Sequence, residues 1–120
     1  MTRTLCIFAL LSVALASCLG RKPVPEGATG AQIYVLQNCK LCHKPDGSGS
    51  DRAPALGNLR EHWTRERLVS YFFDPAPFIA EDPRLKELED THSLPMPRYH
   101  NLTEEQRGVL ADWLLETFGD

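Results

Sequence analysis

The sequence has 120 residues, of which 42% are hydrophobic and 24% are charged, so its composition is that of one soluble globular domain. This composition excludes a disordered chain and a collagen-like repeat. With 13 Lys and Arg against 16 Asp and Glu, the formal net charge is -3, which is too small to indicate nucleic-acid binding. The four cysteines would first suggest two disulfides in a small secreted domain, so their positions decide how they are interpreted.

The N-terminus has the pattern of an export signal. Residues 5–16 form an apolar run that is shorter than the roughly 20 residues a transmembrane helix needs. Leu15-Ala16-Ser17-Cys18 resembles the bacterial lipoprotein lipobox, whose cysteine receives a diacylglycerol and becomes the first mature residue. We therefore expect a lipoprotein signal over residues 1–17, with Cys6 discarded and Cys18 lipidated. Ordinary cleavage without a lipid is the alternative. The expected product is exported and anchored to a membrane, facing the periplasm or the cell exterior.

After Cys18 we expect a flexible tether to residue 27, because residues 19–27 contain two prolines and two glycines and show no apolar periodicity. The remaining domain is predicted to span residues 28–119. It shows no strand alternation and no internal repeat, so the predicted fold class is all-α, with three to five short helices. A domain this small gains limited stability from its core alone, so we expect a bound group to add to it.

Four helices are predicted in chain order. The first begins at the N-cap Thr29 and leads into Cys39. A loop rich in Gly, Ser, Asp and Pro then covers residues 45–58, and a proline-stiffened loop covers residues 93–101. The other three helices are predicted from their caps: 64–73 from Thr64 and the Asp74-Pro75 stop, 83–90 from Asp82, and 103–118 from the capping box of Thr103 and Gln106.

The segment Cys39-Lys40-Leu41-Cys42-His43 has the Cys-x-x-Cys-His spacing of covalent c-type haem attachment. On a helix, residues three apart lie on one side, so both thiols can form thioethers with the vinyl groups of one haem. His43 can then bind the iron from the same side. The motif predicts one haem c, bound covalently through Cys39 and Cys42.

Three other interpretations of the two cysteines stay open. A thioredoxin-like redox pair would need a βαβ setting, which this strand-poor sequence does not provide. A zinc site would need two further ligands at short spacing, and His62, His92 and His100 are scattered. A structural disulfide between Cys39 and Cys42 would close so small a loop that it adds little stability.

A bound haem needs a second axial ligand, for which Met96 is the best candidate. It lies between Pro95 and Pro97, whose fixed φ angles hold the thioether in place with little entropy left to lose. His43 and Met96 together form the ligand pair that is associated with electron-transfer cytochromes. The rival ligands are the three histidines named above, and the alternative role for Met96 is a core methionine.

These motifs together make residues 28–118 resemble a class I, monohaem c-type cytochrome. The resemblance implies that Gly30 and Tyr34 pack on an aromatic residue of the last helix, for which Trp113 is suited. It also implies that the carbonyl of Pro54 holds the Nδ1 proton of the ligand histidine. Residues 74–91 match no motif of the family. The aromatic residues near them are expected to lie in the core or to line the haem pocket: Tyr71, Phe72, Phe73 and Phe78.

The resemblance further implies one-electron transfer, because an iron bound by both His43 and Met96 has no position open to a substrate. We therefore expect an electron carrier with redox protein partners, no small-molecule substrate and no nucleic acid. Two alternatives are kept. One is an open-site cytochrome, peroxidase-like or gas-binding, in which Met96 is not bound. The other is a haem subunit that functions only within a larger oxidoreductase.

Overall fold

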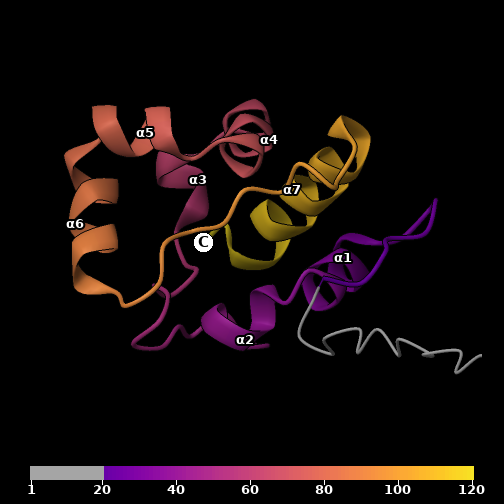
Figure 1. The fold of residues 1–120 in the computed structure, drawn as a ribbon, viewed down its shortest axis with the longest axis horizontal. Coiled ribbons are helices and arrows are strands. Elements are labelled where there is room, and N and C mark those ends of the chain that lie inside the picture. Colours follow the sequence, from indigo (N-terminus) through magenta and orange to yellow (C-terminus); the bar gives the residue numbers. More distant parts are fainter. Residues whose placement is uncertain (1–20) are drawn as a thin grey trace, which may run out of the picture.

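The computed structural model describes residues 21–120, so the predicted signal and Cys18 lie outside the described residues. Within this range the chain is all-α and contains no strand, as predicted (Figure 1). It has seven helices instead of three to five, because three of them are only four to six residues long. The helices are α1 (Gly30–Leu36), α2 (Cys39–His43), α3 (Leu59–His62), α4 (Arg65–Phe73), α5 (Ala76–Glu81), α6 (Pro83–Thr91) and α7 (Glu104–Phe118).

The first predicted helix is divided into α1 and α2. Asn38 adopts a left-handed conformation with φ 65°, which a right-handed helix cannot accommodate, and asparagine tolerates this conformation better than most residues. The prediction that the first helix leads without a break into Cys39 was therefore wrong. Cys39 begins a short helix of its own, which keeps Cys39, Cys42 and His43 together on five consecutive helical residues.

The caps predicted for the later helices are confirmed. Thr64 accepts a hydrogen bond from the backbone N–H of Arg67, at 3.2 Å. Asp82 accepts one from Arg84 at 2.9 Å, with Pro83 in the first turn. Thr103 and Gln106 form the reciprocal capping box of α7, at 3.0 and 3.1 Å. Residues 45–58 and 93–101 contain no helix, as the proline and glycine content predicted.

Helix α7 is the centre of the packing, since α1, α3 and α4 all contact it. Gly30 of α1 lies so close to α7 that a Cβ atom there would collide with Trp113. The rings of Tyr34 and Trp113 are 5.2 Å apart between centroids. These contacts confirm the predicted packing of α1 on an aromatic residue of the last helix.

Helices α5 and α6 pack chiefly against each other and form the end of the domain opposite α1 (Figure 1). Helix α5 was not predicted. Asp74 accepts a hydrogen bond from the N–H of Ala76, and the prolines at 75 and 77 fit a helix start because the first N–H groups of a helix need no partner within it. Aromatic contacts join this end to the rest, because the ring of Phe78 lies 5.7 Å from that of Tyr71 in α4.

Residues 21–27 lie along the domain, and we call them the strap. The Arg21 guanidinium donates hydrogen bonds to the carbonyl of Arg98 at 2.6 Å and to Asn101 Oδ1 at 3.0 Å. It also lies 4.2 Å from the centre of the Tyr99 ring, within cation–π range. The flexible tether expected over residues 18–27 is thus fixed to the domain along its described part. In residues 21–120, no helix has the length and apolar character to span a membrane.

Candidate haem site

An apolar cavity of about 480 Å³ lies between the helices. Its walls come from all the helices except α5, from Arg21 and from the loops over residues 45–58 and 93–101. Cavities of roughly 300–1,000 Å³ with mostly apolar walls are typical of cofactor sites. All five predicted site residues within the described range line it: Cys39, Cys42, His43, Pro54 and Met96.

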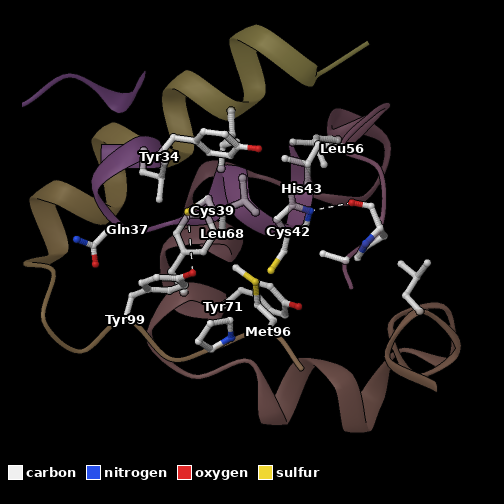
Figure 2. A pocket seen from close by; sticks show the side chains of 18 of the residues that line it. Tyr34, Gln37, Cys39, Cys42, His43, Leu56, Leu68, Tyr71, Met96 and Tyr99 are labelled. Atoms are coloured by element: carbon white, nitrogen blue, oxygen red, sulfur yellow. Dashed lines mark hydrogen bonds between the residues drawn. The ribbon is translucent and has the colours of Figure 1, made fainter. Parts of the chain in front are cut away.

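The two cysteines face this cavity from α2 and are not joined by a disulfide. Cys39 is buried, and its Sγ lies 3.9 Å from the hydroxyl of Tyr99 (Figure 2). Burial raises the pKa of the Cys39 thiol to about 11. Redox-active Cys-x-x-Cys pairs have a lowered thiol pKa instead, so this environment argues against the thioredoxin-like interpretation.

His43 is oriented by the loop that follows α2. Its Nδ1 lies 2.8 Å from the carbonyl oxygen of Pro54, which can only accept a hydrogen bond, so Nδ1 carries the proton (Figure 2). The Nε2 lone pair is then available to a metal. Burial lowers the pKa of His43, which favours the neutral imidazole that binds metals. The contact implied by the family resemblance is therefore present.

The loop can bring Pro54 this close because of Gly49. Its φ is +76°, a conformation that glycine adopts readily, and a Cβ atom at this position would overlap the backbone of Pro54 and Ala55. The N–H of Gly49 donates to the carbonyl of His43 at 3.0 Å. The loop that orients the His43 ring through Pro54 is therefore also hydrogen-bonded to the His43 backbone.

Met96 lines the cavity from the loop before α7 and is half-buried. In Figure 2 it enters from the side opposite α2, which carries the cysteines and His43. Met96 also borders a second cavity of about 70 Å³, together with Tyr71 and Pro54.

The three other histidines are spread over different environments. His62 borders the main cavity, and its side chain is 40% exposed. His92 borders the smaller cavity, where its Nδ1 lies 2.6 Å from the carbonyl oxygen of Leu88. His100 is exposed and stacks on Phe73, with ring centroids 4.5 Å apart. No three His, Cys, Asp or Glu side chains in residues 21–120 form a group that could hold a metal ion.

Sequence reasoning missed two residues of the site. Tyr99 is buried beside Cys39, and Arg21 covers the outer face of its ring. The position of Tyr99, two residues after Pro97, gave no recognisable signal, because its role depends on long-range contacts. One expectation was also wrong: Phe73 is 48% exposed and lies on the surface, whereas Tyr71 and Phe72 line the cavity as predicted.

These residues fit a covalently bound haem c. Two thiols, an imidazole with Nε2 available and a thioether all face one apolar cavity. Thioether formation requires thiols and vinyl groups, and His with Met is a recognised axial pair for haem iron.

Comparison with known proteins gives the same assignment. The family profile for cytochrome c matches residues 27–118. No curated protein and no solved structure matches the chain. Because the family match covers well over half of the sequence, the chain belongs to the cytochrome c family, which implies covalent haem c and electron transfer between redox proteins outside the cytoplasm.

Proposed function

We propose that this chain is a lipid-anchored, monohaem electron carrier. In this proposal residues 1–17 are a lipoprotein signal, Cys18 carries the lipid, and residues 28–119 form the electron-transfer domain. Cys39 and Cys42 hold the haem, while His43 and Met96 bind its iron. Its function is electron exchange with redox proteins at a membrane surface that faces the periplasm or the cell exterior.

The convergence of four side chains of three ligand types, thiol, imidazole and thioether, on one apolar cavity is the observation that carries this proposal. The cysteine pair and the imidazole come from α2, and the thioether comes from a loop more than fifty residues later. A methionine that only filled the core would have no reason to line the same cavity as Cys39, Cys42 and His43.

The residues have separate tasks in this function. When bound, the haem supplies an iron that changes between Fe(III) and Fe(II). Pro54 fixes the orientation of the His43 ring through the Nδ1 hydrogen bond. Met96 offers a neutral ligand, and the apolar walls keep water away, so the extra positive charge of Fe(III) is disfavoured and the reduction potential is raised.

A visible spectrum of the purified protein tests this assignment. We expect the absorption of a low-spin haem c after reduction, and a weak band near the red end of the ferric spectrum that reports bonding of Met to iron. Binding of CO to the native ferrous protein, together with the absence of that band, would favour the open-site alternative. Purification of a stable, reducible monomer would argue against a subunit that functions only within a larger oxidoreductase.

Met96→Ala identifies the second ligand. We expect the haem to stay attached, the ferric red band to disappear and the potential to fall, because the thioether is lost. His92→Ala is the matched control, since His92 borders the same small cavity as Met96, and it should leave the spectrum unchanged. An unchanged spectrum in Met96→Ala would assign the ligand elsewhere.

Cys18→Ser tests the anchor. The variant should leave the membrane fraction, and the mass of the mature protein should lose the added acyl groups. Retention of the variant in membranes would show that another feature holds the protein there.

A further inference from the structure

The strap is joined to three separate parts of the domain. Besides the contacts of Arg21, the backbone N–H of Lys22 donates to the carbonyl of Leu36 at 3.2 Å, and the carbonyl of Lys22 accepts from Gln37 Nε2 at 3.0 Å. Gln37 is only 2% exposed, so this second bond lies at the edge of the core. Further along, the carbonyl of Val24 accepts from Gln106 Nε2 at 3.4 Å. The strap therefore has one defined path over α1, α7 and the loop after Met96.

This path shortens the free linker to the anchor. Cys18 precedes Arg21 by three residues, and an extended chain spans at most about 3.6 Å per residue. A lipid on Cys18 would therefore lie within about 11 Å of the Arg21 backbone, whereas a free linker from Cys18 to Gly27 would allow about 30 Å or more. The surface around Arg21 must then be close to the bilayer.

The start of the strap carries two positive charges, at Arg21 and Lys22, whereas Glu26 lies near its other end. Arg21 and Lys22 are exposed, and neither forms an ion pair within residues 21–120. Arg21 is bonded instead to a carbonyl and a neutral amide, which leave its charge uncompensated. Basic side chains near a membrane are attracted by anionic phospholipid headgroups.

The opposite end of the domain has the opposite charge. Residues 76–91, which contain α5 and α6, carry five carboxylates and two basic side chains. Figure 1 places α5 and α6 at the far end from α1 and the strap. An anionic surface would repel this acidic end and attract the strap, so both charges favour the same orientation.

We propose that the strap fixes the domain in one orientation on an anionic phospholipid surface, with Arg21 and Lys22 at the headgroups and α6 directed away from them. This inference rests on the proposed lipidation of Cys18. In this orientation the strap acts as a contact that orients the domain, not as a flexible spacer. The α5–α6 end then faces away from the membrane, toward the space from which redox partners arrive.

The test uses the lipidated, haem-loaded full-length protein on vesicles of phosphatidylethanolamine and phosphatidylglycerol. Nitroxide labels are placed in Pro23→Cys, which keeps Arg21 and Lys22 unchanged, and, as a second exposed site, in Glu87→Cys of α6. A lipid that carries Ni(II) at its headgroup then enhances relaxation of labels close to the membrane. We expect several-fold greater enhancement at position 23 than at position 87. Equal enhancement at the two positions would overturn the proposal.

Three further measurements separate the parts of the inference. Arg21→Ala should reduce the difference between the two labels while flotation with vesicles persists, and Arg60→Ala, an arginine on α3, should preserve it. A difference that survives Arg21→Ala would overturn the role of the strap.

Replacement of phosphatidylglycerol by phosphatidylcholine should also reduce the difference in relaxation enhancement between the two labels. An unchanged difference would overturn the role of anionic headgroups. Loss of flotation in the unsubstituted protein would refute the anchor itself.

Discussion

The end of the domain formed by α1 and α7 and the end formed by α5 and α6 line the same cavity but are built differently. The first is held by helix packing, with Gly30 pressed against Trp113 and both α3 and α4 resting on α7. The second consists of two short helices that contact chiefly each other, and it is joined to the rest by aromatic rings such as Phe78. The packed end should therefore hold its shape by itself, whereas the α5–α6 end depends more on what fills the cavity.

The largest expected effect comes from removing one leucine at each end. Leu110 of α7 and Leu85 of α6 are both buried and both line the cavity. Leu110→Ala should lower the free energy of unfolding by about 2–5 kcal/mol, because the helices around α7 cannot close the gap. The loss of unfolding free energy in Leu85→Ala should lie at the lower end of that range, because α6 packs chiefly against α5 and can shift to fill the gap. Guanidinium unfolding of the haem-loaded protein measures both, and equal losses would contradict the contrast between the two ends.

The helix contact can be broken at its closest point. Gly30→Ala should cost about 1–3 kcal/mol, because the new methyl group forces α1 away from Trp113. Gly57→Ala is the matched control, since no atom lies within 4 Å of a Cβ placed there, and it should stay within about 0.5 kcal/mol of the parent. A stable Gly30→Ala variant in thermal unfolding would show that the α1–α7 packing tolerates separation.

The role of Gly49 in orienting His43 can be tested against a second glycine that has nearly the same φ angle. Gly27 and Gly49 have φ of +77° and +76°, but only Gly49 has backbone atoms where a Cβ would be. Each alanine variant should lose about 1 kcal/mol from the strained angle, and Gly49→Ala should lose a further 1 kcal/mol or so from crowding. Only Gly49→Ala should change the NMR shifts of the His43 ring, because it displaces the Pro54 carbonyl. Similar spectra for both variants would remove Gly49 from this role.

The smallest effects are expected from surface ion pairs. Arg65 of α4 pairs with Asp112 of α7 at 3.0 Å, whereas Arg84 pairs with Asp82 at 3.6 Å next to α6. Both pairs are partly exposed to water, so Arg65→Ala and Arg84→Ala should each cost less than about 1 kcal/mol. Chemical unfolding in low and high salt checks this. A loss above 2 kcal/mol in Arg65→Ala alone would mean that charge, as well as apolar packing, holds the α1–α7 end.

The sequence predicted most where a structural feature depends on neighbouring residues. The caps at Thr64, Asp82 and Thr103 are local hydrogen bonds, and each is present. The cysteine motif is also local, and its two thiols and His43 face one cavity. The prediction of the first helix failed at Asn38, where one residue in the left-handed region was enough to divide it.

Features that depend on distant contacts were harder to predict. Tyr99 belongs to the site because it contacts Cys39, which lies sixty residues earlier in the sequence. Arg21 lies beside Tyr99 because it donates a hydrogen bond to the carbonyl of Arg98, 77 residues later. Neither pairing leaves a periodic pattern. The fixed path of the strap was missed for the same reason, because prolines and glycines describe only the local backbone and do not reveal what the segment lies against.

The packing of α1 on α7 also constrains the order in which the molecule can form. These helices lie near opposite ends of the described chain, so the cavity cannot close until residues 104–118 have left the ribosome and, in an exported protein, have crossed the membrane. Until then the wall that α7 gives to the cavity facing Cys39 and Cys42 is missing. The late arrival of α7 therefore gives the machinery that attaches the cofactor a period in which both thiols are accessible, and the folding of the last helix ends that period.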